Sequence, residues 1–235
     1  MKRLIKLSVL LIALICFSDT ALAASGNAYI HYYNETTPYG TANRSLTYTQ
    51  ASPHLQSMGY RVYGYNAQGI EQAYTQIQTA RVFVVHNHGE AGLQYMDAAG
   101  YKFIAGLGNE TVMGSPSYPT INGIIINNLS SGALSGLKIA ILYGCNTGIV
   151  GPIRGNLPQL MVNKGATTAV AWKVSTIVDS VNEWNRLFFE KAKSDTIVES
   201  YRHADYWLET IQGSSYASIM SDNRNEAGNI YATIY

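Results

Sequence analysis

The sequence predicts an α/β fold built on a largely parallel sheet. Residues 82–85 and 139–143 are continuous apolar runs of the kind found in strands that are buried on both faces of a parallel sheet. Segments of helical periodicity alternate with such runs, and 47% of the residues are apolar while only 13% are charged. These observations together indicate helices layered on a sheet around one sizeable core.

The first half of the chain reads as β-α-β-α-β. Residues 28–33 predict a strand, and residues 42–58 a helix for which Ser52-Pro53 suits the start and Gly59 the end. Residues 61–65 predict a second strand. Ile70, Ala73 and Ile77 form the apolar stripe of a helix over 69–79, which leads into the strand at 82–85. Right-handed crossovers are expected between these strands.

The second half continues the pattern. Residues 93–97 and 101–104 predict a hairpin appended beyond the strand end, and residues 121–134 favour a helix despite the run of three consecutive isoleucines at 124–126. The remaining segments, in chain order, predict a strand over 137–143, a helix over 155–163, a strand over 167–172, two amphipathic helices containing residues 177–188 and 197–208, and an edge strand over 230–234.

The first 23 residues have the pattern of a secretory signal peptide. Lys2, Arg3 and Lys6 precede an apolar run over 7–17, and Ala21-Leu22-Ala23 is a small-residue cleavage site. The run is shorter than the roughly 20 residues that span a bilayer. We therefore expect a secreted or periplasmic protein with a single domain over 24–235; a lipid anchor at Cys16 is the less favoured alternative.

Charge and cysteine usage restrict the partners. Without residues 1–23 the formal net charge is about −1, which predicts no binding to nucleic acid and none to membranes after signal cleavage. Cys145 is then the only cysteine, so no disulfide can form within the chain. A lone thiol is either an inert core residue or a reactive group, and its neighbours favour the second.

Reactive residues follow both apolar strands directly. His88 and Gly89 come after the first, and Gly144-Cys145 after the second. Functional groups gather beyond the carboxyl ends of strands in open α/β sheets, so neighbouring strands would bring His88 to Cys145. An imidazole activates a thiol, and the N–H groups of Gly89 and Cys145 could stabilise an oxyanion.

The order of these residues argues against other thiol or metal sites. An α/β-hydrolase places its nucleophile before the histidine and within G-x-S/C-x-G, whereas Tyr143 occupies the first glycine position here. Papain-like enzymes also place cysteine first. A zinc site of His86, His88 and Cys145 is a minor alternative because no fourth ligand is evident, and no metal or other cofactor is expected.

The motifs resemble those of caspase-type cysteine peptidases, and especially of CHAT (caspase-HetF-associated) domains. A strand ending in His-Gly precedes a strand ending in Gly-Cys-x-Thr-Gly, followed by Lys164-Gly165-Ala166-Thr167 and Val170-Ala171-Trp172-Lys173-Val174. The resemblance covers about residues 80–210. It implies a caspase-like three-layer α/β/α sandwich with a mostly parallel central sheet and an appended β-hairpin.

The same resemblance implies roles for single residues. His88 would be the general base and acid, Cys145 the nucleophile, and the Gly89 and Cys145 amides the oxyanion hole. Tyr143 and Trp172 would line the substrate pocket, with Lys173 favouring acidic or polar groups or remaining a surface lysine. Ser175-Thr176 replaces the acidic pair of many CHAT domains, so no preference for basic residues is implied.

The sequence thus predicts an exported cysteine endopeptidase that acts on protein or peptide substrates, with an activating partner as a further expectation. The alternative is a caspase-like binding module whose His/Cys dyad is silent. The exposure of the thiol and its distance from His88 distinguish the two.

Overall fold

The computed structural model describes residues 25–37, 40–66, 70–91, 93–95, 102–104, 123–126, 129–150 and 155–235. The predicted signal segment 1–23 lies outside these residues. Within them, no helix combines the length and the hydropathy needed to cross a membrane.

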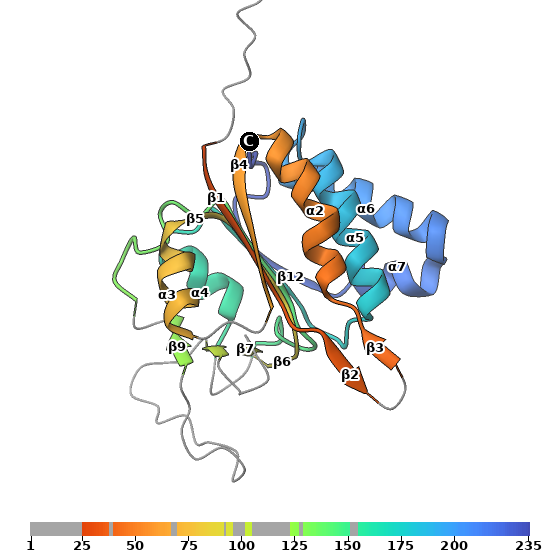
Figure 1. Cartoon of the computed structure of the whole chain (residues 1–235), viewed down its shortest axis with the longest axis horizontal. Coiled ribbons are helices and arrows are strands. Elements are labelled where there is room, and N and C mark those ends of the chain that lie inside the picture. Colours follow the sequence, from red (N-terminus) through yellow and green to blue (C-terminus); the bar gives the residue numbers. More distant parts are fainter. Residues whose placement is uncertain are drawn as a thin grey trace, which may run out of the picture.

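A six-stranded sheet runs through the middle of the described structure (Figure 1). Its strand order is β12-β11-β10-β5-β1-β4, and every neighbouring pair is parallel except β11 with β12. The strands are β1 (Gly26–Tyr32), β4 (Tyr60–Asn66), β5 (Ala80–His86), β10 (Ile139–Tyr143), β11 (Thr168–Trp172) and β12 (Arg224–Gly228).

Helices cover both faces of this sheet (Figure 1). On one face lie α2 (Ser45–Ser57), α5 (Val178–Lys191), α6 (Ile197–Gln212) and α7 (Ser214–Ser221). On the other face lie α3 (Ile70–Thr79) and α4 (Leu157–Asn163). The predicted α/β/α layering is confirmed.

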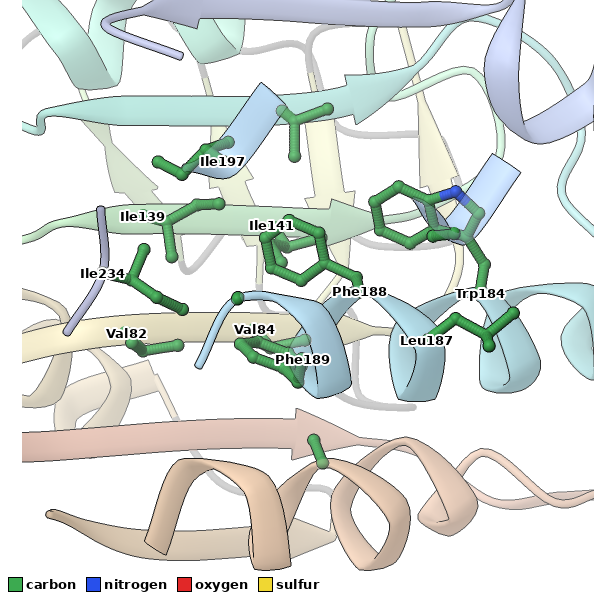
Figure 2. Packing of buried hydrophobic residues seen from close by; sticks show 14 of the residues in the cluster. Val82, Val84, Ile139, Ile141, Trp184, Leu187, Phe188, Phe189, Ile197 and Ile234 are labelled. Carbon is green, nitrogen blue, oxygen red and sulfur yellow. The ribbon is translucent and has the colours of Figure 1, made fainter. Parts of the chain in front are cut away.

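The core follows from the alternation of side chains along the buried strands. Ile139 and Ile141 of β10 point toward α5, where Phe188 packs on them (Figure 2). Ala140 and Leu142 belong to the second core, beneath α3 and α4. All five residues of β10 are buried, which explains why this strand is apolar without interruption.

Two smaller sheets lie outside the central one. A four-stranded sheet has the order β6-β7-β8-β9, and β7 pairs antiparallel with β8, as the predicted hairpin requires. A two-stranded hairpin follows β1. Their strands are β2 (Glu35–Thr37), β3 (Gly40–Ala42), β6 (Gly89–Glu90), β7 (Leu93–Tyr95), β8 (Lys102–Ile104) and β9 (Gly123–Ile125).

Three element predictions need correction. Ser52-Pro53 lies inside α2 and does not begin it, although Gly59, at φ +91°, does follow its end. Where the structure describes the predicted helix 121–134, Gly123–Ile125 form strand β9 and no α-helix is present, in keeping with the β-propensity of branched side chains. The last strand is β12 and not residues 230–234, which carry no strand.

Candidate active site

The site lies where β5 and β10 end side by side. The two strands are parallel neighbours, and Tyr143 pairs with His86 in the last register position. Beyond it, the Asn87 N–H donates to the Tyr143 carbonyl at 3.3 Å. Two residues further along each strand stand His88 and Cys145, so the fold brings both predicted reactive residues to one edge of the sheet.

Gly89 packs directly on the segment that carries the cysteine. A Cβ atom at this position would lie 2.9 Å from both the Cys145 carbonyl oxygen and the Gly144 carbonyl carbon, and would also overlap the Thr147 Oγ1 atom. Real Cβ atoms do not approach so closely, so only glycine fits without a shift. The backbones of the His-Gly and Gly-Cys motifs therefore touch.

The cysteine loop is fixed to the end of β11. The Asn146 N–H donates to the Val174 carbonyl at 3.0 Å, and the Gly148 N–H to the Trp172 carbonyl at 2.7 Å. Asn146 adopts a left-handed conformation with φ 62°, which asparagine tolerates better than most residues. Cys145, directly before these two anchors, is a free cysteine that is partly exposed.

Glu35 contacts His88 and was not predicted from the sequence. The imidazole of His88 is half exposed, and its Nε2 lies 2.9 Å from Glu35 Oε2. Glu35 begins the β2–β3 hairpin just beyond the carboxyl end of β1, the strand beside β5. Its position after a central strand is the signal that could have identified it.

Arg44 lies on the other side of Glu35. Arg44 Nη1 is 3.8 Å from Glu35 Oε2 and donates to the Tyr33 carbonyl at 2.8 Å. Burial lowers the pKa of Arg44, while Glu35 first, and Cys145 and Tyr33 when they are ionised, act in the opposite direction. The guanidinium therefore stands within electrostatic reach of the predicted nucleophile.

His86 belongs to a buried hydrogen-bond network. Its Nδ1 lies 2.6 Å from Thr47 Oγ1, whose hydroxyl donates to Asn182 Oδ1 at 2.9 Å. The Asn182 amide nitrogen donates to the Asn43 carbonyl, which fixes the orientation of that amide. Because the Thr47 proton is committed to Asn182, His86 Nδ1 must be the donor in its own bond.

Electrostatics keeps this imidazole neutral. Burial lowers the pKa of His86 well below its ordinary value, and the positive charges of Arg44 and His88 lower it further. His86 is therefore a structural residue at the end of β5. In the described part of the chain, no three His, Cys, Asp or Glu side chains are grouped to hold a metal ion.

The pocket prediction for two aromatic residues is wrong in this structure. Tyr143 and Trp172 have no exposed surface, and their rings stack on each other at 4.8 Å within the core shared with α5. The Tyr143 hydroxyl donates to Asn185 Oδ1, and burial raises its pKa well above the ordinary value. Both side chains lie inside the core between the sheet and α5, so they cannot touch a substrate in this arrangement.

Lys173 differs from these two residues because it is exposed. Its backbone N–H donates to the Asn223 carbonyl at 2.8 Å, which fixes the chain just beyond β11. A role for its side chain at the rim of a substrate pocket stays a prediction.

Solved structures, but no sequence families, resemble the chain. No protein-family model and no curated protein matches it. The Arg-specific cysteine proteinase gingipain R matches with a TM-score of 0.55 and 10% identity over 90% of this chain and 47% of its own, so this chain spans about half the length of that relative. Saccharomyces cerevisiae separase, solved with securin, matches with a TM-score of 0.48 and 12% identity over 88% of this chain and 12% of its own.

The gingipain R match, together with the mostly parallel sheet between helical layers, assigns the chain a caspase-like α/β fold. At this identity the likeness concerns the fold, and the chemistry must be argued from the site.

Proposed function

We propose that the protein is an exported cysteine endopeptidase of the CHAT type that hydrolyses protein or peptide substrates. The observation that carries this proposal is the meeting of two strand ends, which brings Cys145 and the Glu35-bound His88 to one edge of the sheet. The half-buried state of the thiol favours catalysis over a silent binding module, for which a buried thiol would be expected.

Glu35 determines which nitrogen of His88 can act as the base. A carboxylate only accepts hydrogen bonds, so Nε2 of His88 carries the proton that faces Glu35. The lone pair of the neutral imidazole is then on Nδ1, which is the atom that would take the proton of Cys145. A carboxylate behind the imidazole also stabilises the imidazolium that forms.

The reaction then follows the usual course of a thiol peptidase. The Cys145 thiolate attacks the scissile carbonyl carbon, and the Gly89 and Cys145 N–H groups stabilise the oxyanion, at about 3 kcal/mol per donor. Collapse expels the amine, which takes a proton from His88 and leaves a thioester on Cys145. Water activated by His88 attacks the thioester and releases the carboxylic acid.

The test combines catalysis with covalent labelling. We expect the secreted chain to cleave members of a peptide library, and Cys145→Ala to abolish cleavage while its circular dichroism spectrum stays unchanged. Peptide acyloxymethyl ketones should label the wild-type thiol and also report the pocket preference, including any role of Lys173. An absence of both cleavage and labelling, with an activating partner also tried, would contradict the proposal.

A further inference from the structure

Arg44 is a buried cation at the catalytic edge of the sheet, and the mechanism above does not use it. Only 7% of the residue is exposed. It stands directly before α2 but forms no side-chain cap there, since its side chain reaches back to the end of β1. An arginine is rarely buried unless its guanidinium is paired.

Arg44 and His88 share one carboxylate oxygen. Glu35 Oε2 is 2.9 Å from His88 Nε2 and 3.8 Å from Arg44 Nη1. The Glu35 and His88 side chains are 34% and 52% exposed, so this pair alone would be free to separate into solvent. The Arg44 side chain is 8% exposed and anchored on the Tyr33 carbonyl, and so provides the fixed point of the group.

Tyr33, whose carbonyl accepts the hydrogen bond of Arg44, is itself hydrogen-bonded to β5, the strand that precedes His88. The Tyr33 N–H donates to the His86 carbonyl at 3.3 Å, two residues before His88. The charged or titratable groups around the guanidinium are Glu35, Cys145, Tyr33, His86 and His88. Three of these belong to the site or to its proposed chemistry.

We propose that Arg44 is a positioning residue, which holds the Glu35 carboxylate in place against His88 Nε2. The inference rests on the proposed function, because it assigns Arg44 to the same site. It differs from a catalytic role in that Arg44 acts through Glu35 and does not touch the substrate.

The consequence is a coupling between Arg44 and Glu35 that a structural arginine would not show. Without Arg44 the carboxylate has no fixed partner, so the population of His88 presenting Nδ1 to Cys145 falls. Once Glu35 has been neutralised, the loss of Arg44 has little further effect through this route. The two changes are therefore non-additive.

The test is a double-mutant cycle read by the pH–rate profile for alkylation of Cys145 with iodoacetamide. We expect Arg44→Gln, which keeps a donor for Tyr33, and Glu35→Gln each to lower the rate at pH 7 about tenfold. The profile of each variant should move to higher pH. The alkylation rate of the double variant should be within threefold of the rate of Glu35→Gln, and the rate of Arg44→Lys should be close to that of the wild type.

Arg81→Met is the matched control. Arg81 also donates to a backbone carbonyl, that of Gly136 at 3.1 Å, but stands at the opposite end of β5. Its alkylation profile should equal that of the wild type. A wild-type profile in folded Arg44→Gln, or effects that multiply in the double variant, would overturn the inference. If Arg44→Gln does not fold, the cycle is run with Arg44→Met, which also removes the charge, and multiplying effects again overturn the inference.

Iodoacetamide requires no peptide recognition, so the two proposals fail separately. If the chain cleaves no peptide but the cycle is non-additive, the inference about Arg44 stands and the proposed endopeptidase function is wrong. If the chain cleaves peptides but the effects of Arg44→Gln and Glu35→Gln multiply, the proposed function stands and the inference is wrong.

Discussion

Two histidines that are two residues apart have opposite surroundings. His86 is buried and neutral with its Nδ1 bound to Thr47, while His88 is half exposed and contacts Glu35. The H-x-H pattern alone leaves them equivalent, because alternation along a strand puts both on one side. What separates them is the end of β5: His86 is its last residue, covered by α2, and His88 lies beyond it.

The network around His86 predicts the effect of Thr47→Val. This change keeps the side-chain shape but leaves the His86 Nδ1–H and Asn182 Oδ1 without their partner. We expect a loss of about 2 kcal/mol in the free energy of unfolding, measured in urea. Thr47→Ser, which retains the hydroxyl, should lose less than half as much; equal losses would contradict the role of the hydroxyl.

The sequence could predict which strand ends meet but not all of their surroundings. His88, Gly89 and Cys145 come together as predicted because each follows one of two apolar strands that are neighbours in the sheet. The prediction of Tyr143 and Trp172 as pocket residues neglected the alternation of side chains: Tyr143 lies on the same face as Ile139 and Ile141, which packs against α5. Glu35 has only the weak signal of following a central strand, and its contacts with His88 and Arg44 depend on where the β2–β3 hairpin and the start of α2 lie in the fold.

At the scale of elements, strong periodicity was the reliable guide. The helices α5 and α6 and the buried strands β5 and β10 lie where their patterns predict. Strand β9 was taken for a helix because a short apolar run has no clear period. Strand β12 (Arg224–Gly228) has no apolar pattern that would predict it: its antiparallel pairing with β11 and the side-chain pairs of Arg224 with helix α6 hold it in place.

Those pairs predict the effect of Asp205→Asn on the attachment of β12. Arg224 lies over the Tyr201 ring at 4.8 Å and contacts both Asp205 oxygens at 2.7 and 2.8 Å. Its guanidinium is largely buried, and Asp205→Asn leaves it with Glu226 alone, whose Oε1 lies 2.7 Å from its Nε, so we expect a destabilisation of about 2 kcal/mol in urea unfolding.

Glu199→Gln is the control on the same helix. Glu199 pairs with Arg202, and both side chains are exposed, so its removal should cost less than about 0.5 kcal/mol. Similar losses of unfolding free energy in Asp205→Asn and Glu199→Gln would contradict a larger stabilising effect of the buried Arg224–Asp205 pair.

For the whole molecule, the buried His31 predicts sensitivity to acid. His31 lies on β1 between Phe83 and Tyr65, and neither ring nitrogen has a hydrogen-bond partner of good geometry among the described residues. Burial lowers its pKa from 6.5 to about 4, while the side chain of Gln76 acts weakly in the other direction.

A base whose pKa is depressed by folding weakens the fold as pH falls. Above pH 6.5 His31 is neutral in both states and has no effect, whereas below it the unfolded chain binds the proton first. We expect a loss of roughly 3 kcal/mol between pH 6.5 and 4, which His31→Phe removes while His203→Gln, on a surface helix, does not. An unchanged pH dependence of urea unfolding in His31→Phe would contradict this.

The last strand also holds the loop that follows Cys145. Asn225 of β12 donates to the Gly148 carbonyl at 2.8 Å, three residues beyond the cysteine. During synthesis this bond cannot form until about eighty further residues have followed the cysteine. The loop after Cys145 therefore reaches its final geometry only once β12 has been made, which ties the setting of this thiol to the completion of the whole domain.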